Sequence, residues 1–176
     1  MMNHSKKSQP DLPSLLNALK DKDRYARIAA VEALREIGNA AAVAGLIEAV
    51  ADPDESVRWV AAGALGEIGD ARAVLALLQA LQAADTILQD IAAQSLGRIG
   101  SPAVDKLRAT LNHPDKQVRR LVAQTLGEIG SPNATTDLVD ALQDEDWQVR
   151  WAAVKALENI ATPEALAVAH NWKRLR

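Results

Sequence analysis

The most regular hydrophobic pattern in the chain lies between Asp54 and Gly69 and returns almost unchanged between Asp115 and Gly130. Apolar residues recur there at intervals of three and four positions, which is the spacing of one face of an α-helix. In the first copy they are Val57, Ala61, Ala64, Leu65 and Ile68. Another apolar segment precedes each copy, as in Val43–Val50. The pattern therefore predicts helix pairs, in which a helix A is followed by a helix B.

Helix B recurs with a nearly constant period along the chain. Its reference position holds Arg27, Arg58, Gln89, Arg119 and Arg150, with steps of 31, 31, 30 and 31 residues. A leucine seven positions later and an isoleucine ten positions later recur in all five copies. A fixed period of this length is typical of stacked helical units, in contrast to a domain built around one globular core.

Turn residues separate the expected helices. Helix B ends at glycine in four units, namely Gly38, Gly69, Gly100 and Gly130, and glycine accepts the left-handed conformation that closes a helix. Ser101 and Ser131 precede prolines, so we expect the serines to cap helix A and the prolines to occupy its first turn. Asp52-Pro-Asp54 and Asp144-Glu-Asp146 precede helix B and are expected to cap it, since they lack the glycine and the spaced glutamate of a calcium loop.

These features predict an all-α, right-handed solenoid of five helix-pair repeats plus a C-terminal capping helix. The expected repeats cover residues 11–39, 40–69, 70–100, 101–130 and 131–161, and the capping helix covers residues 163–172. Residues 1–10 are expected to form a disordered tail. Residues 173–176 form a basic tail that either complements the negative end of the capping helix or docks a partner.

Composition limits the possible functions. The chain has 176 residues and no cysteine, which excludes a disulfide framework, a thiol nucleophile and a thiolate metal site. No apolar run reaches the length of a membrane span and the N-terminus lacks a signal-peptide core, so we expect a cytoplasmic protein. The net charge of −3 argues against nucleic acid as the main partner. The three histidines are far apart and no nucleophile elbow or phosphate loop is present, so the sequence predicts no catalytic site, metal or cofactor.

The recurring pattern Asp-x-x-Val-Arg-x-x-Ala-Ala-x-Ala-Leu-Gly-x-Ile-Gly resembles the HEAT-like repeat of the phycobilisome-lyase type, and the resemblance covers about residues 11–172. It implies that helix B of each repeat lines a concave, partner-binding face. The family includes bilin lyase subunits, phycobilisome-degradation factors and many proteins that simply bind other proteins. A related iron-dependent hydroxylase implies paired His-Glu ligands, and since the chain has no His-Glu dipeptide, that activity is not expected.

One face of helix B varies in residue type between copies. It contains the positions one, five and nine residues after the reference position, and the first of these holds aspartate or arginine in two copies. Because a buried unpaired charge is costly, we expect this face to be exposed. Its predicted partner-binding residues are Ile28, Glu32, Trp59, Glu67, Asp90, Arg98, Arg120, Glu128, Trp151 and Lys155. With Glu36 included, acids outnumber bases on this face, which opposes a phosphate-binding groove.

The tryptophans allow two interpretations. Trp59 and Trp151 either anchor a partner, as exposed tryptophans often do, or pack over alanine-rich neighbours. Trp147 lies at the start of its helix, where it either extends the Trp151 patch or covers the turn.

An aspartate precedes the reference arginine by four residues in four units. The pairs are Asp23/Arg27, Asp54/Arg58, Asp115/Arg119 and Asp146/Arg150. Side chains four residues apart can pair on one helix, and each arginine can also reach an aspartate of the adjacent repeat. We expect a structural ladder that sets repeat stacking, and Gln89 predicts a looser middle because it interrupts the ladder.

Together these features predict a non-catalytic scaffold that binds another protein along the helix B face and is a monomer or weak homodimer. The resemblance implies an alternative, a bilin lyase subunit or chaperone whose partner is a phycobiliprotein. A third interpretation is a self-associating structural rod.

Overall fold

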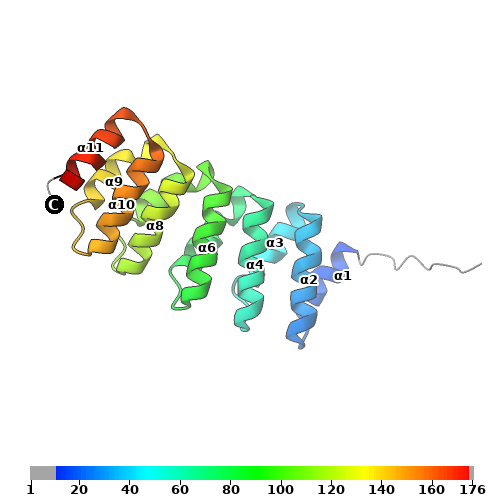
Figure 1. The fold of residues 1–176 in the computed structure, drawn as a ribbon. Helices are drawn as coiled ribbons and strands as arrows, with labels where there is room; N and C mark the ends of the chain where they lie inside the picture. Colours follow the sequence, from blue (N-terminus) through cyan, green and yellow to red (C-terminus); the bar gives the residue numbers. More distant parts are fainter. Residues whose placement is uncertain (1–10, 175–176) are drawn as a thin grey trace, which may run out of the picture.

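The computed structural model describes residues 11–174, which form two layers of helices (Figure 1). The first layer contains the A helices, α1 (Leu12–Ala18), α3 (Ala40–Ala49), α5 (Val74–Leu81), α7 (Val104–Thr110) and α9 (Thr135–Ala141). The second contains the B helices, α2 (Arg24–Ile37), α4 (Glu55–Ile68), α6 (Thr86–Ile99), α8 (Lys116–Ile129) and α10 (Trp147–Ile160). The terminal helix α11 (Pro163–Arg174) contacts α10. The predicted all-α solenoid of five helix pairs plus a terminal helix is confirmed.

The B helices begin and end at the residues that their local chemistry favours. An aspartate side chain accepts a hydrogen bond from a backbone N–H at the start of each one; these residues are Asp23, Asp54, Asp85, Asp115 and Asp146. Four B helices end at a glycine with positive φ, and α10 ends at Ala161, whose φ is 56°. Ala161 therefore adopts a conformation that usually favours glycine.

The A helices of the last three repeats begin with a turn of 3-10 helix. These turns are η1 (Ala71–Ala73), η2 (Ser101–Ala103) and η3 (Pro132–Ala134). Pro102 and Pro132 occupy the first turn as predicted. The predicted cap at Ser101 is wrong, because Gly100 holds the capping position before η2. Ser131 holds the capping position before η3, but its side chain forms no capping hydrogen bond in the described residues. A proline in the first turn supplies no N–H of its own, so fewer donors there need a cap.

A continuous core runs between the two layers. The leucine seven positions after the reference residue is completely buried in every repeat; these residues are Leu34, Leu65, Leu96, Leu126 and Leu157. Alanines surround them, and small side chains let neighbouring B helices approach closely. A Cβ atom added at Gly127 of α8 would lie 2.5 Å from the Cα of Ala156 in α10. At the same register in α6, a Cβ atom added at Gly97 would meet only side-chain atoms of α8.

The ends of the chain differ in part from expectation. The disordered tail expected for residues 1–10 lies outside the described residues. Helix α11 continues to Arg174, so Lys173 and Arg174 form its last turn, although the sequence analysis assigned both to a basic tail. Their charges lie where they complement the negative end of the helix.

Candidate protein-binding surface

Three of the reference arginines, Arg27, Arg58 and Arg119, join their repeat to the next one. The guanidinium of Arg27 donates to both carboxylate oxygens of Asp52 at 2.9 and 2.8 Å, and Arg119 donates to those of Asp144 at 2.7 and 2.9 Å. The remaining Nη1 of each arginine donates to two backbone carbonyls of its own turn. Both bridges are largely buried. Buried bidentate pairs of this kind hold two repeats in one relative orientation.

Of the two arrangements expected for these arginines, the structure has the bonds to aspartates of the adjacent repeat and not the pairs on one helix. Asp23, Asp54, Asp115 and Asp146 all cap their helices, and among the described residues none pairs with the arginine four positions later. Instead, Asp54 accepts from Arg24 and Asp146 from Lys116, both in the preceding repeat. The physical reason is that a capping carboxylate turns toward the helix start, while the reference side chain reaches across to the next unit.

Asp52 and Asp144 are the main acceptors of the ladder, although the sequence indicates them only as turn residues. Both lie six positions before a reference residue. The sequence shows that aspartate recurs at this position, but it does not show that its side chain binds the arginine of the preceding repeat.

The ladder is interrupted in the middle of the rod. Ala83 and His113 occupy the position of Asp52 and Asp144 in the third and fourth repeats. Gln89 donates to the carbonyl of Ala83 at 2.8 Å, and its buried Oε1 has no hydrogen-bond partner in the described structure. Between residues 70–100 and 101–130, the described side chains form no ion pair. A looser middle remains a prediction that follows from this interruption.

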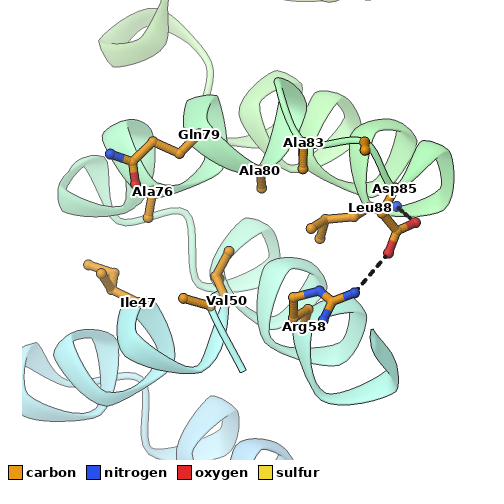
Figure 2. A pocket seen from close by; sticks show the side chains of 11 residues that line it. Ile47, Val50, Arg58, Ala76, Gln79, Ala80, Ala83, Asp85 and Leu88 are labelled. Atoms are coloured by element: carbon orange, nitrogen blue, oxygen red, sulfur yellow. Dashed lines mark hydrogen bonds and ion pairs between the residues drawn. The ribbon is translucent and has the colours of Figure 1, made fainter. Parts of the chain in front are cut away.

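A groove lies between the second and third repeats, where the ladder changes (Figure 2). It encloses about 450 Å³, with apolar walls formed mainly by Ile47, Val50, Ala76, Ala80 and Leu88. Because Ala83 lacks a carboxylate, Arg58 turns to Asp85 at the rim, where Nη2 and Oδ2 are 3.4 Å apart. The groove is therefore a consequence of the irregular turn, and its only charged lining residues, Arg58 and Asp85, pair with each other.

Replacing Ala83 with aspartate is expected to restore the missing pair with Arg58. The net gain should be about 1 kcal/mol, because a charge-assisted hydrogen bond is favourable and its desolvation is partial. Thermal unfolding should show a rise of roughly 2–4 °C in Tm. Ala84→Asp places the same charge on the exposed neighbour and is the control. An equal rise in both variants would mean that charge, and not the pair, is responsible.

The predicted surface residues are distributed over the B helices with graded exposure. Glu67, Asp90, Arg98, Glu128, Trp151 and Lys155 are exposed, whereas Ile28, Glu32, Trp59 and Arg120 are half-buried. None of them lies in the core. This face of the B layer is accessible along its whole length.

Trp59 and Trp151 occupy equivalent positions but have different surroundings. The indole Nε1 of Trp59 donates to Asp85 of the next repeat at 2.8 Å, and the ring packs against the core. A hydrogen bond from the backbone N–H of Leu88 lowers the pKa of Asp85, and the bonds from Trp59 and Arg58 lower it further. Burial raises this pKa, but by less than the bonds lower it. Trp59 therefore joins two repeats. Trp151 is 45% exposed, since only α11 follows α10 in the described chain.

An aromatic surface lies at the C-terminal end of the B layer. Trp147 is 63% exposed and lies one turn before Trp151 on α10. The ammonium groups of Lys155 and Lys173 lie 5.3 and 5.4 Å from the centre of a Trp151 ring, within the range of a cation–π interaction. A hollow of about 240 Å³ lies beside these rings, between α8 and α10. We call it the tryptophan hollow; it is lined mainly by Arg120, Gln124, Trp147, Gln148, Trp151 and Lys155.

Within residues 11–174, no group of histidine and acidic side chains is arranged to hold a metal ion. None of the described helices is long and apolar enough to cross a membrane.

Comparisons with solved structures find the same architecture in proteins of different function. The chain is 26% identical to a chain from the complex of CpcE and CpcF of phycocyanin lyase from Nostoc sp. PCC7120, over 94% of this chain and 71% of that chain, with a TM-score of 0.59. A designed armadillo repeat protein in complex with the peptide (KR)4 is 19% identical over 94% and 89%, with a TM-score of 0.56. Human deoxyhypusine hydroxylase is 24% identical over 89% and 65%, with a TM-score of 0.59. The last two likenesses show the fold alone.

Sequence comparison agrees with the helix pairs. No curated protein matches the sequence. A model of HEAT repeats matches residues 12–97, 45–112, 74–143 and 104–170, which together span nearly all of the described chain. With five stacked helix pairs at a constant period, the chain belongs to the HEAT-repeat family.

Proposed function

We propose that this protein is a non-catalytic scaffold that binds another protein through the exposed face of its B helices. The observation that carries the proposal is the exposure of two neighbouring tryptophans, Trp147 and Trp151, beside a hollow. Large aromatic side chains are costly to leave in water and are common anchors of protein interfaces. Trp59, whose indole is already bonded to Asp85, has a structural role in this proposal.

Helix spacing favours the B layer as the concave side. Each B helix contacts the B helices of its neighbours, whereas most A helices contact one another only sparsely. In a curved rod, the layer with the closer helix spacing lies at the inner radius. A concave B face would surround a bound segment and bury more of it than a convex face of equal length.

Related folds support the general class. HEAT and armadillo repeats occur in proteins captured with partners, including the CpcE and CpcF complex and a designed protein with a peptide. The net charge of −3 is compatible with a protein partner and opposes nucleic acid. A cytoplasmic location and a monomeric or weakly dimeric state belong to the same proposal.

The expected result of an affinity capture from source lysate is a protein that wild type retains and the variant Trp147→Ala/Trp151→Ala loses. Both rings are exposed, so this variant should keep its fold, as circular dichroism would show. Leu75→Ala is the control, since Leu75 is 62% exposed on α5 in the other layer. Equal capture by all three proteins would place the binding site elsewhere and contradict the proposal.

A bilin lyase subunit or phycobiliprotein chaperone is the second candidate function. The likeness to the phycocyanin lyase complex, at 26% identity over 94% of this chain, favours it. A visible chromophore adduct after co-expression with a phycobiliprotein and bilin would establish it. A self-associating rod, the third candidate, would instead show a concentration-dependent mass in light scattering that Trp151→Asp abolishes.

A further inference from the structure

The tryptophan hollow has an unusual charge balance. Its lining contains the cationic side chains of Arg120 and Lys155, two glutamines and two tryptophans, and no carboxylate of residues 11–174. By contrast, the large groove of Figure 2 contains a cation and an anion that already bind each other. The hollow therefore combines two aromatic rings with two cationic side chains.

Arg120 is a half-buried cation held only by neutral groups. Its Nε donates to the amide oxygen of Gln117 at 3.2 Å, and its Nη1 donates to that of Gln124 at 2.8 Å. Among residues 11–174, no carboxylate pairs with Arg120, in contrast to Arg27, Arg58 and Arg119. The two amides orient the guanidinium without neutralising it, so its charge is available to an anion.

Positive charge also lies beside Trp151, on the α10 side of the hollow. Lys155 and Lys173 both lie over Trp151, and in the described part of the chain they share a single carboxylate, Glu158. The two ammonium groups and the one carboxylate together have a net charge of +1. Bonds to Lys173 and Lys155 lower the pKa of Glu158, so this carboxylate stays ionised and the arrangement persists at neutral pH.

We propose that the tryptophan hollow binds an acidic segment of the partner protein, in which an apolar side chain lies against Trp147 and Trp151 and a neighbouring aspartate or glutamate pairs with Arg120. This inference rests on the proposed function and specifies the chemistry of its partner. The planar guanidinium suits a carboxylate because it can donate two parallel hydrogen bonds. The hollow is small, and the carboxylate of Glu128 in the adjoining hollow would repel a long polyanion such as a nucleic acid.

The test uses the four indole N–H signals of the full chain in nitrogen-15 NMR spectra. The probes are a short peptide that alternates leucine with glutamate, its counterpart with lysine in place of glutamate, and oligothymidine. We expect the acidic peptide to shift the Trp147 and Trp151 signals and the lysine peptide to bind at least about tenfold more weakly. Added salt should weaken the binding of the acidic peptide, because it screens the attraction between opposite charges.

Arg120→Gln should reduce the affinity for the acidic peptide roughly tenfold, since one charge-assisted contact is lost. Lys106→Gln removes an exposed cation of α7 in the other layer and should leave the affinity unchanged. Equal affinity in wild type and Arg120→Gln would overturn the inference. So would stronger shifts with oligothymidine, or no shift of either indole with the acidic peptide. If the lysine peptide shifts both indoles equally well, the acidic preference fails while protein binding at this surface stands.

Discussion

Asp144→Ala is expected to lower the free energy of unfolding by about 3–5 kcal/mol. Asp144 accepts two hydrogen bonds from Arg119, and the two side chains are only 11% and 9% exposed. The substitution leaves the guanidinium desolvated, with only the exposed Glu145 as a charged partner. It also removes the acceptor for the backbone N–H of Asp146 at the start of α10. Urea unfolding followed by circular dichroism would measure the loss.

Asp105→Ala is the matched control for this prediction. Its carboxylate also pairs with an arginine, Arg108, but its side chain is 89% exposed and the atoms are 3.6 Å apart. Exposed pairs of this kind contribute little, so the expected change is within about 0.5 kcal/mol. Similar losses in Asp144→Ala and Asp105→Ala would show that the buried bridge contributes no special stability.

The same bridge should have a signature in acid. Burial raises the pKa of Asp144, but the bonds from Arg119 and from the backbone N–H of Asp146 outweigh it, so the pKa in the folded chain lies below the usual 3.8. A lowered pKa in the folded state means that the contribution is present above pH about 4 and is lost as pH falls through the folded pKa. Asp144→Asn should therefore lose less stability than wild type between pH 4 and strongly acidic conditions.

Gly127→Ala is expected to destabilise the chain by about 1–3 kcal/mol, although alanine is the better helix former. The added Cβ would lie 2.5 Å from the Cα and 2.7 Å from the Cβ of Ala156. A backbone atom cannot rotate away as a long side chain can, so α8 and α10 must move apart. This separation would disturb the core along the whole junction.

Gly63→Ala is the same substitution at another site, and it is expected to stabilise the chain. Nothing lies within 4 Å of a Cβ atom added at Gly63, on the open face of α4. The only effect is the gain in helix propensity, so we expect about 0.5–1 kcal/mol of stabilisation. Thermal unfolding should thus give shifts of opposite sign for the two variants. A stabilising Gly127→Ala would mean that the two helices are free to separate at little cost.

Local sequence determined the helices of this protein. Capping aspartates, terminal glycines and apolar residues at intervals of three and four act within a few positions, so the five units and their buried leucines could be read from the chain. The helix ends follow these signals, as in α2, which begins directly after Asp23 and ends directly before Gly38. The serine caps were not determined in this way, because in the described chain the side chain of neither Ser101 nor Ser131 accepts a hydrogen bond at the start of its turn.

Tertiary structure decided how the repeats contact one another. Arg119 binds Asp144, twenty-five residues away, and not Asp115, because the helix start already holds the nearer carboxylate. Trp59 and Trp151 occupy the same position in their repeats. In the described chain, only Trp59 donates a hydrogen bond to the aspartate that caps a following B helix. The periodicity assigns a side chain to a face of its own helix. Its exposure and its partner depend on the adjacent repeat, whose position is set only when the units stack.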